Sequence, residues 1–502
     1  MRYEHPHRTE TRFGRTHLPD PGEDCATIAV IGGGFSAICL AAHLHRSPRG
    51  RAKVFVFERG RPGNGVAFGT REAAHLLNGP AGNLSAFDDA RDDFVDFLRT
   101  DPHAHDFLDP AIPLPEQFVP RMLYTRYLEH LMSQLEHPSA SGTTVHFVKA
   151  EVRDVAEARG RLDVILDDGS TVGVSAAVLA IGHPPPRSIG SRIDERFVID
   201  DPWNAAAIRA LRKDVPVAIV GSGQTATDIM LSLLSNGHRS DITLISRRGC
   251  IAQPYIHVRT PHAVERDDLP SRLLPLMRWI RSESQRVVEA GGDWRAVVNA
   301  LRPHTQPIWA GFSQAEKRAF LEHVSPFWHM HRTRLPPKTA VTFSELMDSG
   351  RVRVIAGRIT ASEAKGDLIT LHVRRRSAER IEKVVVGAAI NCTGPSWNNE
   401  KPQNPLLSSL LRSGMVRWDE VGYGIEATAE GTLFDAEGHP LKRLFAVGPV
   451  CRGSLLEIIA IRDIRTQCAT LASRLLGGTE AVEQFVPGSA EALHADLPEP
   501  SG

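Results

Sequence analysis

The chain has 502 residues, 42% of them hydrophobic, and its 59 acidic residues balance 59 basic ones. This length predicts two or three domains with sizeable cores, and the balanced charge argues against binding to nucleic acid or to an anionic membrane. Residues 1–24 lack the apolar core of a signal peptide, and no apolar run is long enough to span a bilayer.

Six cysteines are scattered along the chain, and no two of them have a C-x-x-C spacing. This pattern argues against a metal cluster and against a redox-active disulfide. Cys39 lies in an apolar helical segment and Cys392 ends an apolar strand, so we expect both thiols to be buried. The pattern is typical of the reducing cytoplasm, where we place the protein.

The first ordered unit is predicted as a strand at 27–31, a glycine turn, a helix from about Phe35 and a strand at 53–57. In such a turn Gly32 lets the chain reverse, Gly34 lets a pyrophosphate approach the backbone, and Ala37 lets helix and strand pack closely. Glu58 ends the next strand, where a carboxylate can accept both hydroxyls of a ribose. The unit therefore predicts a dinucleotide site, and the alternative is a purely structural glycine turn.

A loop at 60–86 follows and is longer than most connections, which indicates a functional segment. We then expect helices near 89–99 and 121–135. Short strands are predicted at 144–148, 151–156, 162–166 and 177–180, and they end at the three prolines of AIGHPPP.

A second glycine turn lies in VAIVGSGQTATDIM at 217–230, where Gly221, Gly223 and Ala226 repeat the pattern. The next strand ends in Ser246, Arg247 and Arg248 instead of an acid. A pair of guanidinium groups suits a 2′-phosphate, so this site is predicted to prefer NADPH to NADH. The alternative is a solvated basic turn.

From 251 to 337 helical patterns replace the strands, and we interpret this insert as a cover for the substrate. Its cluster WHMHRTR contains His329, His331, Arg332 and Arg334, which could bind a substrate that carries a carboxylate, or could be outward charges at a helix end. Strands are predicted again at 351–356, 368–373, 384–392 and 443–448, before a helix at 455–476.

The order of these motifs resembles that of the two-dinucleotide flavoproteins. Within them the chain is similar to the FAD-NAD(P)-binding family, which is related to class B flavin monooxygenases and amino-acid N-hydroxylases. The resemblance covers about residues 25–478. The segments that carry it are GGGFSA at 32–37, GVAFGT with HLLNGPAGNLSA at 65–86, FVPRMLYTRYL at 118–128, IDDPW at 199–203, FWHMHRTRLPP at 327–337 and VGPVCRGSLLE at 447–457.

The resemblance implies an α/β fold with two Rossmann-like dinucleotide-binding domains of glutathione-reductase-like topology and a helical insertion. FAD would occupy the first site and NADPH the second. The implied division is a flexible arm at 1–24, an FAD-binding domain at 25–206 and 396–478, an NADPH-binding domain at 207–395 with the insert at about 251–337, and a tail at 479–502.

Site residues follow from the same resemblance. For FAD they are Gly32, Gly33, Gly34, Ala37, Glu58, Ser85, Val152, Gly182 and Gly448. For NADPH they are Gly221, Gly223, Gln224, Ala226, Ser246, Arg247 and Arg248. His75 and Asn78 of the long loop are expected beside the isoalloxazine as catalytic residues, although either could serve the fold alone.

One segment departs from the monooxygenase fingerprint, because Asp200 and Asp201 lie between Phe197 and Trp203 where a histidine is usual. The first functional hypothesis is an FAD- and NADPH-dependent monooxygenase that uses molecular oxygen and N-hydroxylates a small amine or amino acid. The alternatives are an NADPH-dependent flavin reductase that serves a quinone, metal or protein acceptor, and an FAD-containing redox sensor or interaction protein. The oligomeric state is left open.

Overall fold

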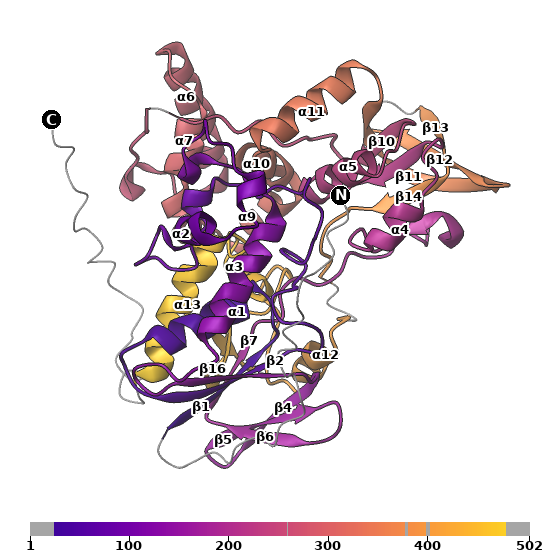
Figure 1. Ribbon diagram of the computed structural model, residues 1–502. Helices are drawn as coiled ribbons and strands as arrows, with labels where there is room; N and C mark the ends of the chain where they lie inside the picture. The colour runs from indigo at the N-terminus through magenta and orange to yellow at the C-terminus, as the bar shows by residue number, and fades with distance from the viewer. Residues whose placement is uncertain (1–24, 259, 377–379, 398–401, 478–502) are drawn as a thin grey trace.

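The computed structural model describes residues 25–258, 260–376, 380–397 and 402–477. The predicted arm at 1–24 and tail at 479–502 therefore lie outside the described residues. Two sheets with their helices stand beside one another, and a group of helices from the middle of the chain lies above the first sheet (Figure 1). Among the described residues, no helix combines the length and the apolar character needed to cross a bilayer.

The first sheet has the strand order β15-β16-β7-β1-β2-β3 and is parallel except for β15. Its strands are β1 (Ala26–Ile31), β2 (Ala52–Phe57), β3 (Thr144–Val148), β7 (Ala176–Leu179), β15 (Thr432–Phe434) and β16 (Pro440–Ala446). The central strands are apolar on both faces because helices cover one face and a small antiparallel sheet covers the other (Figure 1). The covering helices are α1 (Phe35–Arg46), α2 (Asp93–Thr100), α3 (Arg121–Gln134) and α13 (Ile461–Leu476).

The small sheet consists of β4 (Val152–Ala158), β5 (Arg161–Leu166) and β6 (Thr171–Val174). The sequence predicted the first two strands and missed β6, which is only four residues long. Helix α13 also differs from the prediction, since it begins at Ile461 rather than at Leu455. Residues before it form turns, and Glu457 among them accepts from the Trp328 indole at 2.8 Å.

The second sheet has the order β13-β12-β11-β10-β9-β14-β8. Its strands are β8 (Val198–Ile199), β9 (Val217–Val220), β10 (Ile242–Ser246), β11 (Val352–Lys365), β12 (Leu368–Arg375), β13 (Ile381–Val386) and β14 (Ala388–Asn391), with helices α4 (Ala205–Ala210) and α5 (Gln224–Ser235). Strand β8 pairs with β14, so this sheet already includes residues before the predicted boundary at 207. The chain thus has two Rossmann-like domains, as predicted.

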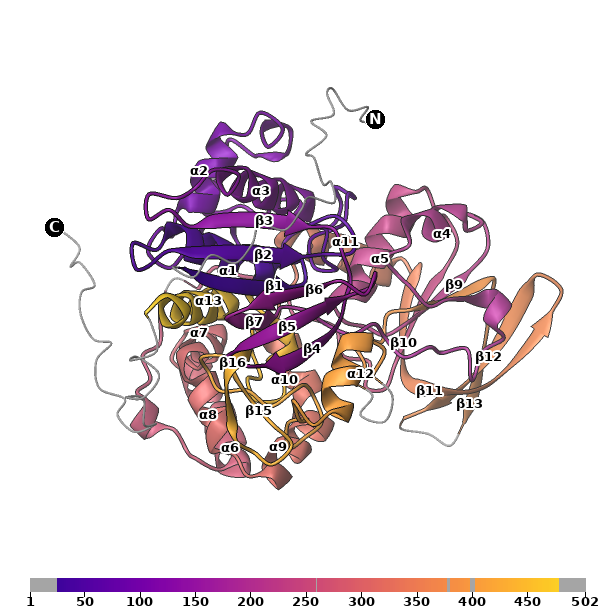
Figure 2. The ribbon, with the colours of Figure 1, turned by 90° about the horizontal axis from the view of Figure 1, so that it is seen from below.

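The predicted helical insert is also present, as α6 (Leu273–Glu289), α7 (Arg295–Ala300), α8 (Thr305–Gly311), α9 (Gln314–Ala319) and α10 (Ser325–Arg332). A single π-helical turn at Phe320–Val324 joins the last two. The insert helices lie above the first sheet in Figure 1, and Lys317 of α9 forms an ion pair with Glu420, in the segment before β15; Figure 2 shows the same helices from below. Helix α11 (Pro337–Asp348) then leads back to the second sheet, and α12 (Pro405–Arg412) packs against β4.

Two contacts join the first domain to helix α5 of the second. Arg121 forms an ion pair with Asp228 at 2.8 Å, and both side chains are largely buried. His75 contacts the Ser232 hydroxyl at 2.7 Å and the Asp228 carbonyl at 2.9 Å through Nε2. Because these contacts are buried and polar, they fix how the two domains face each other.

Candidate functional site

The first glycine turn is shaped by its backbone. Gly32 has φ +113°, and a side chain there would overlap the carbonyl oxygen of Ala180 at the end of β7. Its N–H donates to the Phe57 carbonyl at 2.9 Å. Only glycine fits this position, so the turn brings the N-terminus of α1 against the ends of three parallel strands.

Gly34 precedes α1 and offers no side-chain cap to the helix. A Cβ atom on Gly34 would meet only the Cα of Gly65, at 3.9 Å. The protein's own packing therefore does not require glycine there, whereas a pyrophosphate at the helix N-terminus would. Ala37 is fully buried and packs α1 onto the sheet as expected.

Glu58 lies directly after β2, at the position predicted for ribose binding. Its carboxylate accepts from the N–H of Gly33 at 2.8 Å and from the N–H of Gly60 at 2.7 Å. These bonds fix both oxygens beside the turn and still leave acceptor sites on each of them.

Three other residues predicted for the first site come from later parts of the chain. Gly448 has φ +77°, and a Cβ atom on it would overlap the Ser36 hydroxyl of α1. Its N–H donates to Gln467 Oε1 at 2.9 Å, whereas Gln467 Nε2 is buried without a partner among the described residues. Gly182 has φ +69° and open space around it, and Val152 begins β4 with its side chain buried.

The second turn has the same backbone geometry. Gly221 has φ +126°, a Cβ atom on it would overlap the Cys392 carbonyl oxygen, and its N–H donates to Ile245 at 2.8 Å. Gly223 precedes α5, and nothing lies within 4 Å of the position where its Cβ would be. Ala226 is fully buried, and Gln224 starts the helix with its amide 3.4 Å from the Arg334 carbonyl.

The residues after β10 do not form the predicted pair of free guanidinium groups. Ser246 accepts from Ser222 at 2.8 Å and so shapes the turn. Arg247 is exposed and makes no hydrogen bond or ion pair with the described residues. Arg248 instead donates to the Glu322 carbonyl of the insert at 2.7 Å and lies 5.4 Å from the ring centre of Phe327. The structure leaves one arginine, Arg247, unengaged at the strand end.

The long loop places its three predicted residues in different surroundings. His75 is buried, and Thr70 contacts its Nδ1 at 2.7 Å while α5 engages Nε2. Burial lowers the pKa of His75, so the ring stays neutral. Ser85 is fully buried and donates to the Ala90 carbonyl at 2.7 Å, whereas Asn78 is exposed. A catalytic role for His75 and Asn78 stays a prediction, and only Asn78 has a side chain open to a ligand.

The four residues of the WHMHRTR cluster do not project as solvated charges. Arg332 forms an ion pair with Glu457 at 2.6 Å, and its side chain is only 12% exposed. Arg334 is 3% exposed and donates through Nε to the His331 carbonyl at 3.0 Å. His331 donates through Nδ1 to the Phe327 carbonyl at 2.8 Å, and its ring packs edge-on against Trp294.

His329 of the same cluster faces the first domain. Its Nε2 lies 3.4 Å from a guanidinium nitrogen of Arg452. Burial, and then the charge of Arg452, lower the pKa of His329 to about 4. The same two causes lower the pKa of His183, in the AIGHPPP segment, to about 3. Both imidazoles are therefore neutral near pH 7.

Sequence reasoning missed His183, Arg302, Arg452, Glu457 and Asp463. Arg452 and Glu457 stand in the segment VGPVCRGSLLE, which carried part of the resemblance, but no local pattern marks them. Burial raises the pKa of Asp463 to about 6, against the opposing effect of Arg332. These residues meet only when the insert packs against the segment at 448–463.

The fingerprint position without its histidine has a structural use here. Asp200 accepts from the Ser188 hydroxyl, from the Ile189 N–H at 3.1 Å and from Asn391 at 2.9 Å. These bonds lower the pKa of Asp200 against the opposing effect of burial, and they join the interdomain linker to the end of β14. All six cysteines are free, and Cys39 and Cys392 are buried as predicted.

Comparisons with known proteins agree with this geometry. Residues 29–184 match the model of the FAD-NAD(P)-binding family, as predicted for this part of the chain. No curated protein sequence matches the chain. An ornithine N-hydroxylase from Kutzneria sp. 744, solved with reduced FAD, NADP⁺ and L-ornithine, is 16% identical with a TM-score of 0.63, over 90% of this chain and 99% of that one.

Two further solved structures share the architecture. A cadaverine monooxygenase from Erwinia amylovora, bound to FAD, is 14% identical with a TM-score of 0.60, over 95% of this chain and 99% of that one. A bacillithiol disulfide reductase from Staphylococcus aureus is 11% identical with a TM-score of 0.52, over 91% and 99%. Residues 29–184 therefore match the FAD-NAD(P)-binding family, and over 90% and 95% of its length the chain shares the two-domain fold of the solved ornithine and cadaverine enzymes.

Proposed function

We propose that the protein is an FAD- and NADPH-dependent monooxygenase that N-hydroxylates a small amine or amino acid with molecular oxygen. The observation that carries the proposal is the pair of matching glycine turns, each with a helix N-terminus left open beside its second glycine. Two dinucleotides would fit these turns, and the insert packs against the segment that follows Gly448. The fold likeness to ornithine and cadaverine hydroxylases supports the same reading.

The residues present fit FAD in the first site. The backbone around Gly32 and Gly34 would bind the pyrophosphate, and Glu58 the ribose. Two buried polar atoms without partners among the described residues, His183 Nδ1 and Gln467 Nε2, could serve the flavin end. In the second site the turn at Gly221 would bind the NADPH pyrophosphate and Arg247 its 2′-phosphate. Bound FAD would supply the electron transfer and the oxygen activation.

The chain's own residues supply shielding. Trp309 donates to the Gly453 carbonyl at 2.8 Å, and Trp328 donates to Glu457 at 2.8 Å. These bonds attach the insert to the segment that follows Gly448. A closed cover excludes water from the reaction, which a monooxygenase needs more than a simple reductase does.

The charges of the site favour a nucleophilic amine. Arg302, Arg334 and Arg452 have no carboxylate partner among the described residues, and Arg332 is paired with Glu457. A surplus of guanidinium groups lowers the pKa of a nearby substrate ammonium. The amine would therefore lose its proton more readily, and its free electron pair could attack the activated oxygen.

The overall reaction balances as amine, dioxygen, NADPH and one proton giving hydroxylamine, water and NADP⁺. The free cysteines support a reducing cytoplasmic location, and the small-molecule substrate and oxygen are the only partners that the proposal needs. The charge balance of the chain gives no reason to add nucleic acid.

The test is anaerobic reduction of the FAD-loaded protein with NADPH, followed by mixing with isotopically labelled dioxygen and a panel of amines and amino acids. A hydroxylated product that carries the label supports the proposal. Hydrogen peroxide as the only oxygen product, with rapid reduction of a quinone or ferric chelate, would replace it with the flavin reductase alternative. Absence of NADPH oxidation with any acceptor would favour the redox-sensor alternative.

A further inference from the structure

The order of the strands fixes the direction in which a dinucleotide would cross the first sheet. Strands β16, β7, β1 and β2 are parallel neighbours in that order (Figure 2). The glycine turn follows β1, and Glu58, at the place for the ribose of the adenine half, follows β2. The flavin half would therefore extend the other way, across the ends of β7 and β16. His183 follows β7 and Arg452 follows β16, so both lie on that path.

Arg452 is a buried guanidinium group, with only 7% of the residue exposed. One of its terminal nitrogens lies 3.4 Å from Nε2 of His329, and its Cζ lies 5.0 Å from the ring centre of Tyr423. Its Nε has no hydrogen-bond partner among the described residues, and none of their carboxylates forms an ion pair with it. A buried charge without a counter-charge is unfavourable, so Arg452 is suited to an anion that the chain itself does not supply.

The ionisable groups around Arg452 do not neutralise it. The negative charge of Glu457 reaches His329, but both oxygens of this carboxylate are engaged, by the Trp328 indole at 2.8 Å and by Arg332 at 2.6 Å. The imidazoles of His183 and His329 are neutral near pH 7, because burial and then the charge of Arg452 lower their pKa values. Among the described residues, the charge of Arg452 is thus uncompensated.

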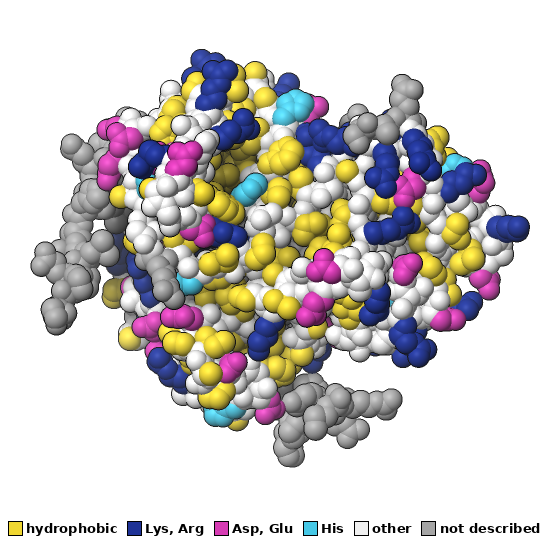
Figure 3. Space-filling model, turned by 90° about the horizontal axis from the view of Figure 1, so that it is seen from above, with side chains coloured by type: hydrophobic (Ala, Val, Ile, Leu, Met, Phe, Trp, Pro, Cys, Tyr) yellow, Lys and Arg dark blue, Asp and Glu magenta, His cyan; other side chains and the backbone are white. Residues whose placement is uncertain are grey.

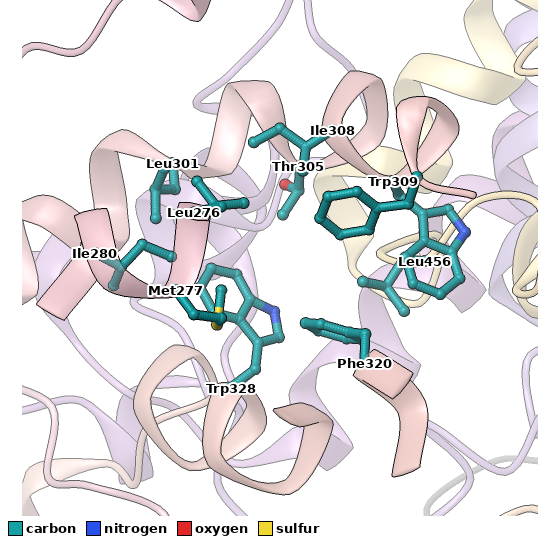
Figure 4. Close-up of a pocket in the computed structure, with 11 residues that line it drawn as sticks. Leu276, Met277, Ile280, Leu301, Thr305, Ile308, Trp309, Phe320, Trp328 and Leu456 are labelled. Carbon is teal, nitrogen blue, oxygen red and sulfur yellow. The ribbon is translucent and has the colours of Figure 1, made fainter. Parts of the chain in front are cut away.

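The short segment that carries Arg452 is held at both ends. At its start Gly448 packs against Ser36 of α1, directly after the glycine turn. At its end the Gly453 carbonyl accepts from the Trp309 indole at 2.8 Å. Trp309 belongs to the apolar core of the insert, which Leu456 of the segment also lines (Figure 4). The positive charge is therefore fixed in surroundings of low polarity, where it acts strongly on a neighbouring charge.

FAD acquires a negative charge when NADPH reduces it. The hydride brings two electrons and one proton, so NADPH and FAD give NADP⁺ and singly negative FADH⁻. We propose that Arg452 stabilises this charge and so raises the reduction potential of FAD in the first site. The inference rests on the FAD site of the proposed function, but neither on the identity of the substrate nor on the reaction with oxygen.

The reduction potential of the FAD-loaded protein, measured against a redox dye without oxygen, NADPH or substrate, tests the inference. Arg452→Gln should lower the preference for reduced over oxidised FAD at least tenfold, or about 30 mV for a two-electron couple. Arg452→Lys keeps the charge and should lower it less. Arg462→Gln removes a charge at an exposed position of α13 and should change the preference less than about threefold. An unchanged potential in Arg452→Gln, or an equal shift in Arg462→Gln, would overturn the inference.

A second anion that could bind Arg452 is the carboxylate of a substrate, and a matched pair of ligands detects it. Putrescine is L-ornithine without its carboxylate, and isothermal titration measures the binding of both to the oxidised, FAD-loaded protein. If Arg452 serves the flavin, Arg452→Gln should change the two affinities by the same factor. If Arg452→Gln weakens only L-ornithine and leaves the potential unchanged, the anion is the substrate and the inference is wrong.

FAD content and circular dichroism show whether each variant folds. If Arg452→Gln does not retain FAD, a pH titration of the chemically reduced parent protein, followed by flavin absorbance, tests the same charge. Bound reduced FAD should stay negative to at least one pH unit below the midpoint of free reduced FAD in the same buffer, and an equal midpoint would overturn the inference.

Product analysis separates this inference from the proposed function. The expected potentials without any oxygenated product would refute the monooxygenase and keep the role of Arg452. An oxygenated product from a protein whose potential does not depend on Arg452 would keep the monooxygenase and refute that role.

Discussion

The two glycine turns share a backbone and differ in what surrounds it. Gly32 and Gly221 both have positive φ, both would clash with a carbonyl of a neighbouring strand if they carried a side chain, and both donate to the strand that follows the helix. The first turn, however, is the more enclosed of the two, because Gly65 lies 3.9 Å from the Cβ position of Gly34 and Gly448 packs against Ser36 of the following helix, whereas no atom lies within 4 Å of the Cβ position of Gly223. The same turn can thus hold a resident cofactor when enclosed and an exchangeable coenzyme when open.

The surface around the open site agrees with this difference. In the view from above, Lys and Arg side chains are frequent over the second domain, and hydrophobic side chains gather towards the middle of the face (Figure 3). Acidic side chains are interspersed among the basic ones. A coenzyme that binds and leaves during each turnover needs such local attraction without a strong overall field.

The largest effect is expected from Gly34→Val, which directs a side chain into the pyrophosphate path of the enclosed turn. FAD affinity should fall at least a hundredfold while the fold is kept, because no protein atom lies closer than 3.9 Å to the new Cβ. Flavin absorbance after desalting measures the loss. The matched variant Gly223→Val should keep its FAD and lose NADPH binding, and a yellow Gly34→Val protein would refute the assignment of the first site.

The next effect concerns the strand end of the open turn. Arg247→Ala should raise the KM for NADPH by about ten- to a hundredfold, because a charge-assisted bond to a phosphate contributes roughly 1.5–3 kcal/mol. The KM for NADH should not change. Arg248→Ala is the control, and a larger effect there than at Arg247 would show that Arg248 leaves Glu322 to bind the coenzyme.

A pH effect distinguishes the strands that support the two turns. His183 follows β7 in the first domain, and Pro395 has the matching place after β14 in the second domain. The pKa of His183 is lowered from 6.5 to about 3, so below pH 6.5 the unfolded chain takes up a proton that the folded one does not. The contribution of His183 to the free energy of unfolding is then fully present above pH 6.5 and is lost as the pH falls towards 3.

Between pH 7.5 and pH 5 this histidine should reduce the free energy of unfolding by about 2 kcal/mol. Urea unfolding of His183→Asn with excess FAD should show that much less dependence on pH than the parent protein. His257→Asn, at an exposed position, is the control. An unchanged pH profile in His183→Asn would show that the imidazole is not buried in its neutral form.

The smallest effect is expected from Glu58→Gln, which keeps the shape of the strand end and removes its charge. FAD affinity should fall by about tenfold, or roughly 1.4 kcal/mol, since the ribose hydroxyls would lose charged acceptors while the backbone contacts remain. Flavin fluorescence during dilution measures the dissociation. Unchanged retention would indicate that Glu58 serves only the N–H groups of Gly33 and Gly60.

Sequence reasoning succeeded where the decisive contacts are local. Each glycine turn lies between a buried strand and an apolar helix, and a short pattern is enough to specify that unit. It failed where a partner comes from a distant element. Nothing near Arg248 in the sequence indicates that its guanidinium group will donate to the Glu322 carbonyl. Trp328 likewise is 129 residues away from its acceptor Glu457.

Contacts with distant elements also decide what the polar residues of the long loop do. The resemblance places His75 beside the flavin, which stays a prediction, and the structure shows the ring buried between Thr70 and Ser232. Ser85 is also predicted to lie at the FAD site, and its hydroxyl donates to the Ala90 carbonyl in a local turn. A polar residue in a functional loop can serve the ligand or the loop itself, and only the tertiary packing decides which.

The place of β16 in the first sheet has a consequence for how the protein is made. Strand β7 pairs with β1 on one side and with β16 on the other, and β16 ends at Ala446. The strands of the second sheet all lie between Val198 and Asn391, so a ribosome releases that sheet whole before it has finished the first. During synthesis the second domain can thus fold early. The first sheet, in contrast, must keep one edge of β7 unpaired until nearly the whole protein has been translated.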